Sequence, residues 1–386
     1  MRSRTARDAI PTRHDLGPTG YRADVRWLIA RFLAMSYRIN NEQIDADINQ
    51  LVADVVATKD GLSTDADLVR EIIVTALKLI KDEAGRGDIK MMNTALKELR
   101  YSSLVFEPHA DVKKVAVYGS ARTPRDDPNY LLAEEFAYKM AHDHGFMVIT
   151  GAGPGIMEAA NKGAGTEASF GVNIRLPFEN GANVYLSPGK VINFKYFFTR
   201  KVQFVKESDA FALFPGGFGT MDEAFELLTL IQTGKSDLHP IVMIDSPGTG
   251  YWKAWEHLCQ TLIDQGMISP DDTNLYLVTS DIDEAIDYIT RFFAVYHSQR
   301  YVDQRLVLRL RSQISDDLVS ELNAEFPDIL ASGSIVKIDA TQAEIDSGDN
   351  IDLPRLMLDF NRRSYGRLRS LIDHLNNEAP TTGASV

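Results

Sequence analysis

The sequence predicts an α/β fold in which a doubly wound parallel sheet follows a helical N-terminal region and precedes a small α/β appendage. Residues 22–101 carry apolar side chains at helical spacing and contain no convincing strand. From Val112, short β-rich segments alternate with helical ones, as in parallel strands joined by crossover helices. After Tyr296 the pattern weakens to two short strands and two helices.

The composition is that of a folded protein with an acidic surface. The chain of 386 residues is longer than one compact core usually holds, so more than one domain is expected. Its 44% hydrophobic residues can supply a sizeable interior. Lys and Arg number 41 against 54 Asp and Glu, and the net charge of −13 disfavours nucleic acid and acidic membranes as partners. The single cysteine, Cys259, cannot form an intramolecular disulfide. We expect a cytoplasmic protein without structural metal, nucleic-acid partner or membrane span.

The chain is expected to have five segments. Apolar residues at helical spacing run from Val25 to Phe32 and from Ile44 to Val55, and two more N-terminal helices are expected at 67–83 and 88–100. The expected segments are a flexible arm 1–21, a helical region 22–110, a sheet domain 111–297, a small α/β region 298–377 and a flexible tail 378–386.

The sheet domain is expected to alternate regularly between strands and helices. Asp127 followed by Pro128 is typical of a helix start. Strands are expected at 114–118, 146–150, 169–174, 209–214, 240–244 and 275–278. Helices are expected at 128–144, 155–165, 193–207, 220–233, 250–266 and 281–296. The appendage is expected to hold strands at 306–311 and 334–338 and helices at 316–325 and 354–375.

Two glycine loops follow expected strands, where ligands of such sheets bind. The first holds Gly119, which permits a tight turn, and Ser120, whose hydroxyl can meet a phosphate or ribose oxygen. This loop alone is weak evidence for a binding site. In the second, glycines let the backbone approach an anion at a helix N-terminus; its residues are Gly151, Gly153, Gly155 and the following Met157. The spacing is not G-x-G-x-x-G, and an ordinary βα turn remains the alternative.

The third loop is the strongest signal for an anion site. It joins an apolar strand to a helix, and its glycines expose successive N–H groups to a phosphate. Its candidate binding residues are Pro215, Gly216, Gly217, Gly219 and Thr220. Glu223 lies three residues after Thr220, which is also the spacing of a capping box, so that structural alternative stays open.

The expected helix 193–207 carries two adjacent cations, Arg200 and Lys201, among aromatic residues. Such cations usually belong to a solvated face, and aromatics at helical spacing usually belong to a core. The helix precedes the strand that leads to Pro215, so it could also bring Arg200 to the glycine loops. Spacing alone does not decide between these interpretations.

The ordered motifs resemble the LOG family, named for the plant "Lonely Guy" enzyme. They are Gly151-Ala152-Gly153-Pro154-Gly155-Ile156-Met157, Phe197-Phe198-Thr199-Arg200-Lys201 and Pro215-Gly216-Gly217-Phe218-Gly219-Thr220-Met221-Asp222-Glu223. The similarity covers about residues 112–296. Family members are cytokinin riboside 5′-monophosphate phosphoribohydrolases and related nucleotide 5′-monophosphate nucleosidases, many of them once labelled lysine decarboxylases.

The resemblance implies a Rossmann-like domain that hydrolyses the N-glycosidic bond of a nucleoside 5′-monophosphate without a cofactor or metal. Glu223 matches the family's catalytic glutamate and Arg200 its catalytic arginine, with Lys201 as a less certain partner in substrate binding. The third loop matches the positions that hold the 5′-phosphate. The longer branch of the family also implies a homo-oligomer, a dimer or larger.

Two departures from the family put the preferred base in doubt. Short members carry Met-His-Glu-Arg-Lys where this chain has Thr199 before Arg200, and Gly-Gly-Gly where it has Ala152 between glycines. The retained arginine and glutamate leave the reaction class intact, whether the substrate is AMP or a cytokinin nucleotide.

Other functions remain open at this point. A non-catalytic nucleotide sensor or scaffold would keep the phosphate loop without turnover. A nicotinamide-dependent oxidoreductase is disfavoured because no acid follows the strand that ends at Ile174, although Arg175 could meet a 2′-phosphate. No convincing Schiff-base lysine supports a pyridoxal-dependent decarboxylase. Four arginines near the last helix are interpreted as a solvated face, an effector pocket or a subunit contact; they are Arg362, Arg363, Arg367 and Arg369.

Overall fold

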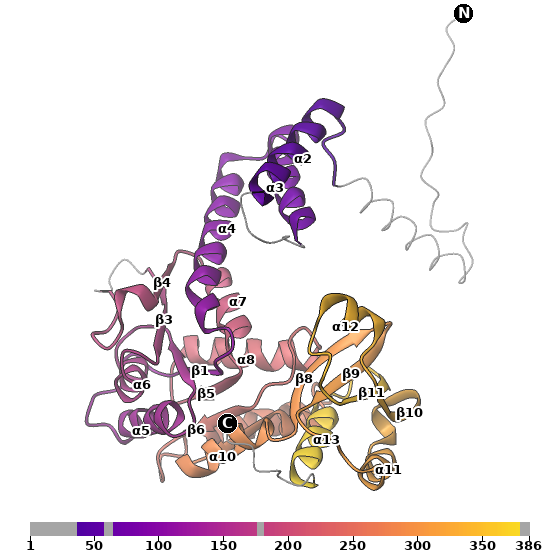
Figure 1. The fold of residues 1–386 in the computed structure, drawn as a ribbon. Helices are drawn as coiled ribbons and strands as arrows, with labels where there is room; N and C mark the ends of the chain where they lie inside the picture. Colours follow the sequence, from indigo (N-terminus) through magenta and orange to yellow (C-terminus); the bar gives the residue numbers. More distant parts are fainter. Residues whose placement is uncertain (1–36, 58–64, 176–180, 379–386) are drawn as a thin grey trace, which may run out of the picture. The chain divides into compact units, whose positions relative to one another are not determined.

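A computed structural model describes residues 37–57, 65–175 and 181–378 (Figure 1). The chain divides into two compact units, one ending at Asn93 and the other beginning at Thr94. The expected arm 1–21, the apolar pattern from Val25 to Phe32 and the tail after residue 378 lie outside the described residues. The domain boundaries at 110 and 297 stay predictions.

The first unit is helical, as expected. Its helices are α2 (Glu42–Val56), α3 (Ala66–Lys81) and the beginning of α4 (Arg86–Phe106). The Asn41 side chain accepts a hydrogen bond from the Ile44 N–H and so caps α2. Arg70 of α3 donates to Asn49 of α2 at 2.5 Å, which links these two helices. The expected helices at 67–83 and 88–100 are therefore confirmed.

A seven-stranded parallel sheet forms the centre of the second unit and confirms the predicted fold class. Its strand order is β4-β3-β2-β1-β5-β6-β7, so the order reverses beside β1. All six neighbouring pairs are parallel. The strands are β1 (Lys114–Tyr118), β2 (Met147–Thr150), β3 (Ser169–Ile174), β4 (Val191–Phe194), β5 (Ala210–Leu213), β6 (Ile241–Ile244) and β7 (Tyr276–Thr279).

Helices cover both faces of this sheet, because alternate residues of each strand point to opposite sides. Val115 and Val117 pack with α5, α6 and α10, whereas Ala116 and Tyr118 belong to the core that includes α7, α8 and α9. Figure 1 shows α5 and α6 side by side on one face. These helices are α5 (Pro128–His142), α6 (Ile156–Ala164), α7 (Phe197–Glu207), α8 (Phe218–Gln232), α9 (Tyr251–Asp264) and α10 (Ile282–Phe292). The Asp127 carboxylate accepts the Asn129 N–H, which confirms that helix start.

The C-terminal region holds a four-stranded antiparallel sheet of order β10-β11-β9-β8. Its apolar residues, such as Leu308 and Leu322, join the same core as α7, α8 and α9. The elements are β8 (Tyr296–Val302), β9 (Arg305–Leu310), α11 (Asp316–Glu325), β10 (Leu330–Ile338), α12 (Gln342–Ser347), β11 (Arg355–Phe360) and α13 (Tyr365–Glu378). Short 3-10 helices occupy η1 (Glu107–His109), η2 (Pro188–Lys190), η3 (Pro270–Leu275) and η4 (Pro327–Ile329).

Three expected helices were too long at one end. The predicted helix 193–207 begins only at Phe197, because residues 191–194 pair with β3 as an edge strand. The predicted helix 281–296 ends at Phe292, since Tyr296 begins β8. The predicted helix 354–375 was wrong over its first turns: residues 355–360 form β11 between β9 and β10. Strand pairing overrides local helical preference at these positions.

Within the described ranges, no helix combines the length and the apolar character needed to cross a membrane. In the same residues, no group of three or more His, Cys, Asp or Glu side chains is placed to hold a metal ion.

Candidate active site

The three glycine loops meet at Ser120, at the carboxyl edge of the sheet. Its N–H donates to the carbonyl of Pro215 at 3.0 Å, and its carbonyl accepts the N–H of Ile156 at 3.0 Å. The loop after β1 is thereby bonded to the loop after β5 and to the start of α6. The strand order reverses beside β1, which is where doubly wound sheets bind ligands.

Gly119 and Gly155 allow this close approach. A β-carbon at Gly119 would lie 2.6 Å from the Ile156 side chain, and one at Gly155 would lie 2.3 Å from the Ser120 carbonyl oxygen. Gly155 also has a φ of +66°, in the region that favours glycine. These two glycines have a structural reason of their own, and their contact with a substrate stays a prediction.

The second loop packs against the side chains of Met157 and Arg200. A β-carbon at Gly151 would approach Arg200 Nη2 to 2.5 Å, and one at Gly153 would approach the Met157 methyl to 2.7 Å. Glycine therefore leaves room for the guanidinium. Between them Ala152 has a φ of +65°, an unfavourable conformation for a residue with a side chain.

Polar side chains hold this loop in place. The Ala152 N–H donates to Thr150 Oγ1 at 3.0 Å. The Asn183 amide donates to the carbonyls of Ala152 at 3.3 Å and Gly153 at 3.2 Å. It also donates to Asn161 Oδ1 at 2.9 Å. These contacts fix a strained backbone in one conformation.

The third loop begins α8 one turn earlier than a capping box would require. Gly217 is the N-cap, without a side-chain cap, and Thr220 and Glu223 both lie inside the helix. The capping-box alternative for Glu223 is therefore wrong. Thr220 packs on Gly216, where an added β-carbon would lie 2.0 Å from Thr220 Oγ1. The first turn of a helix leaves its N–H groups without intrahelical partners and carries a partial positive charge, which suits a phosphate.

Arg200 points into the sheet edge and does not lie on a solvated face. Its Nε donates to the carbonyl of Val172 at 2.9 Å, and its guanidinium carbon lies 5.2 Å from the centre of the Phe204 ring. Lys201 turns instead to α8, where its Nζ lies 2.8 Å from Asp222 and 2.9 Å from Glu226. Lys201 thus links α7 to α8, and its contact with a substrate stays a prediction.

Glu223 is a buried ionisable group of this site. Only 8% of it is exposed. Burial raises its pKa to about 7, against the opposing effect of the positive charges of Arg200 and Lys201. A carboxyl group that is half ionised near neutral pH can both accept and donate a proton.

Sequence reasoning missed Tyr118. Its buried hydroxyl has no hydrogen-bond partner among the described residues. Burial and then the charge of Glu223 raise its pKa well above the usual value, and Arg200 opposes this. Tyr118, Arg200 and Glu223 therefore share one electrostatic environment. Tyrosine at the end of an apolar strand was the only sequence signal for it.

Glu98 of α4 was missed as well. Its carboxylate accepts the Lys195 N–H at 2.7 Å and the Thr199 hydroxyl at 2.6 Å, at the first turn of α7. One turn further on, Ser102 donates to Gln203 at 3.0 Å. The negative charge lies at the favourable end of the α7 dipole. The end of α4 thus positions the helix that carries Arg200, and a contact across about 100 positions leaves no local sequence signal.

The fold and the site define a doubly wound α/β domain in which a glycine loop at a helix start lies near a half-buried arginine and a buried glutamate. Residues 155–289 match the family model described as "Possible lysine decarboxylase". Curated relatives include the cytokinin riboside 5′-monophosphate phosphoribohydrolase LOG1 of Arabidopsis thaliana, 28% identical over 120 residues. Another, from Mycobacterium tuberculosis, carries the same phosphoribohydrolase name and is 34% identical over 87 residues. Over these segments the sheet domain is similar to proteins of the LOG family.

The matched segments cover 30% and 22% of this chain, and the chain spans about half the length of these relatives, 55% and 45%. Among solved structures, the molybdenum cofactor carrier protein of Chlamydomonas reinhardtii is 22% identical and covers 47% of this chain and 97% of its own. Its TM-score is 0.33, so the fold assignment rests on the strand order described above.

We expect the contact between Glu98 and Thr199 to stabilise the fold. Glu98→Ala should lower the free energy of unfolding by about 1 kcal/mol, because it removes the acceptor for the first turn of α7. Thr199→Val should give a smaller loss, and the double variant should show a coupling of at least about 0.5 kcal/mol in urea denaturation. The neighbouring Lys97→Ala is the control. Strictly additive losses would contradict the contact.

The buried Glu223 should make stability depend on pH. Its pKa is raised in the folded protein from 4.5 to about 7, so folding favours the protonated form. The stabilisation is complete below the unfolded pKa and is lost as the pH rises through about 7. Glu223→Gln should therefore reduce the fall in unfolding free energy between about pH 5 and pH 8 by about 2 kcal/mol. Urea titrations of both proteins measure this.

The exposed Glu135→Gln on α5 is the matched control and should leave the pH dependence unchanged. If Glu223→Gln and wild type lose stability in parallel as the pH rises, the raised pKa of Glu223 is wrong.

Proposed function

We propose that the protein hydrolyses the N-glycosidic bond of nucleoside 5′-monophosphates to free base and ribose 5-phosphate. The observation that carries the proposal is the buried Glu223, whose pKa lies near 7 within reach of the charge of Arg200. The names of the phosphoribohydrolase relatives point to the same reaction. AMP and cytokinin riboside monophosphates are both candidate substrates.

The third loop would hold the 5′-phosphate. The N–H groups of the first turn of α8 and the Thr220 hydroxyl offer hydrogen bonds to its oxygens. The Tyr251 hydroxyl donates to the Gly216 carbonyl at 2.6 Å and keeps this loop in shape. A fixed phosphate would place the sugar beside Glu223, four residues into the same helix from Gly219.

Bond cleavage builds positive charge on the sugar, as in other glycoside hydrolyses. The Glu223 carboxylate would stabilise this charge and take a proton from the attacking water. The water oxygen bonds to C1′ as the bond from C1′ to the base nitrogen breaks, and the departing base takes up a proton. Arg200, always charged, would hold the ribose or phosphate oxygens or assist the departing base.

We expect Glu223→Gln to lower kcat for base release by about 10²- to 10⁴-fold, because the amide cannot accept the proton. The apparent affinity for the nucleotide should change little, since the loop that holds the phosphate is intact. Arg200→Lys should also lose activity because the planar fork is lost. Free base and ribose 5-phosphate are measured after incubation with a panel of nucleotides.

Glu135→Gln, which removes an exposed carboxylate of α5, is the control and should keep the activity. Unchanged catalysis by Glu223→Gln would remove Glu223 from the mechanism. Tight nucleotide binding by wild type without release of base would favour a non-catalytic sensor or scaffold instead.

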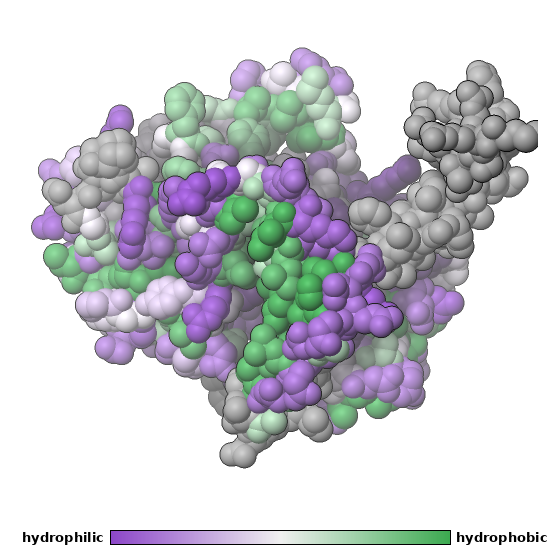
Figure 2. Space-filling view, turned by 90° about the horizontal axis from the view of Figure 1, so that it is seen from above, coloured by the Kyte–Doolittle hydropathy of each residue, from purple (hydrophilic) through white to green (hydrophobic). Residues whose placement is uncertain are grey.

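We also propose that the protein is a homo-oligomer. Apolar side chains are exposed on α7 and α8, including Val202 at 52% and Phe218 at 96%. The helices α2 and α3 expose further apolar side chains, among them Leu51, Leu68 and Ile80, and Figure 2 shows an apolar band between hydrophilic residues on this separate surface. Extended apolar surface of this kind marks protein interfaces.

The mass in solution tests self-association. Light scattering should give a multiple of the 43.0 kDa chain mass. Val202→Glu should shift the distribution towards the monomer, because it places a charge in the interface. Leu131→Glu, on α5 at a position that is 55% exposed, should not. A wild-type monomer at micromolar concentration would contradict the proposal.

A further inference from the structure

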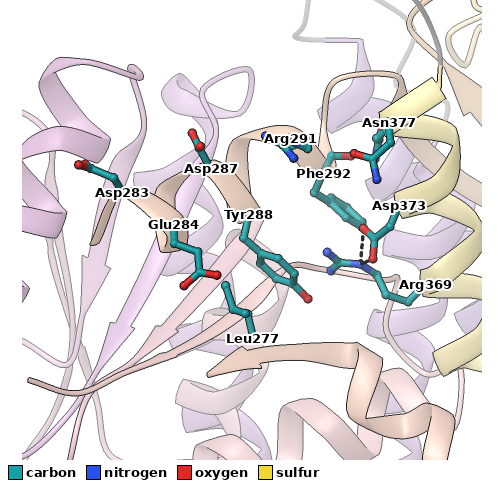
Figure 3. A pocket seen from close by; sticks show the side chains of 11 residues that line it. Leu277, Asp283, Glu284, Asp287, Tyr288, Arg291, Phe292, Arg369, Asp373 and Asn377 are labelled. Atoms are coloured by element: carbon teal, nitrogen blue, oxygen red, sulfur yellow. Dashed lines mark hydrogen bonds and ion pairs between the residues drawn. The ribbon is translucent and has the colours of Figure 1, made fainter. Parts of the chain in front are cut away.

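A cavity lies between α10 and α13, away from the glycine loops. Its volume is about 580 Å³, and both helices supply its walls (Figure 3). Tyr288 and Phe292 of α10 and Arg369 and Asp373 of α13 line one end. Asp283 and Asp287 of α10 lie toward the other end. Nothing in the proposed hydrolysis uses these residues.

Arg369 is buried at this cavity, which bears on the three alternatives given for the arginines near the last helix. Only 1% of its side chain is exposed. Its Nε donates to both carboxylate oxygens of Asp373 at 2.9 Å. Its guanidinium carbon lies 4.4 Å from the Tyr288 ring centre and 4.6 Å from that of Phe292. The interpretation of Arg369 as part of a solvated face is therefore wrong.

Two buried donors at this end have no hydrogen-bond partner among the described residues. They are Arg369 Nη1 and the Tyr288 hydroxyl. Figure 3 shows the two side chains pointing toward each other from opposite walls of the cavity. Buried polar groups are almost always hydrogen-bonded, and each of these two groups can donate a hydrogen bond to an acceptor oxygen. The aromatic walls fix the guanidinium, so the donors are held in place before a ligand binds.

The charges around the cavity narrow the class of ligand. Arg291 and Arg369 contribute two positive charges, against the negative charges of Asp283, Glu284, Asp287 and Asp373. This excess of acids disfavours a phosphate dianion. A single carboxylate can accept from Arg369 and Tyr288, and a positive group on the same molecule would be attracted to the acidic end.

We propose that this cavity binds a small zwitterion of the α-amino acid class. Its carboxylate accepts hydrogen bonds from Arg369 Nη1 and the Tyr288 hydroxyl. Its ammonium group faces Asp287 of α10, which carries no ion pair within the described ranges, whereas Asp283 already pairs with Lys139 at 2.8 Å. The cavity volume accommodates even a large amino-acid side chain against Leu277 and the aromatic walls.

Binding to the full chain tests the proposal. The twenty common L-amino acids are screened by thermal shift at millimolar concentration, and those that raise the melting temperature are titrated by calorimetry. We expect at least one to bind with one site per chain. Acetate, which has no ammonium group, should bind more weakly, and inorganic phosphate should not displace the amino acid.

Tyr288→Phe keeps the ring that stacks on Arg369 and removes only the hydroxyl, so the variant should fold. The variant should bind the amino acid at least about tenfold more weakly, because one hydrogen bond to the charged carboxylate is lost. Tyr138→Phe, an exposed tyrosine on α5, is the control and should bind as wild type does. Absence of binding by all twenty amino acids, equal affinity in Tyr288→Phe, or displacement by phosphate would each overturn the proposal.

Discussion

The candidate active site depends on the two backbone hydrogen bonds of Ser120. One joins the loop after β1 to the loop after β5, and the other joins it to the start of α6. Because the peptide groups must approach so closely, Gly119 and Gly155 have no room for a side chain. The third glycine loop and the loop that holds Gly151 and Gly153 are thus held together by backbone hydrogen bonds, which is the preorganisation that the proposed catalysis requires.

The same packing sets the chemistry of Glu223 and Arg200. Burial raises the pKa of the carboxyl group, and the neighbouring cations lower it again, which leaves it near neutrality. Arg200 donates a hydrogen bond to the Val172 carbonyl, and the placement of α7 fixes its backbone. Glu98 fixes the first turn of α7 from α4, so a helix outside the segment matched by the family model contributes to the geometry of the site.

The sequence alone predicted the parallel sheet, most of its helices and the three loops at one edge, because apolar periodicity and glycine placement are local signals. It could not predict β4, β8 and β11, whose pairing partners lie elsewhere in the chain. The capping-box alternative for Glu223 could be rejected only once the structure showed that α8 begins at Phe218. Tyr118, Glu98 and the buried state of Arg369 follow from tertiary contacts and carry no periodic pattern. The substrate contacts of the glycine loops and Lys201 stay predictions.

The comparison of AMP with adenosine tests the central claim most directly, that this site cleaves a 5′-monophosphate held at the start of α8. Release of adenine and of ribose 5-phosphate is followed for AMP, and release of adenine and ribose for adenosine, at equal concentrations. We predict that kcat/KM for AMP exceeds that for adenosine by at least about a hundredfold, because binding of the phosphate positions the sugar. Equal cleavage of both compounds, or cleavage of neither AMP nor any other nucleoside monophosphate, would contradict the account.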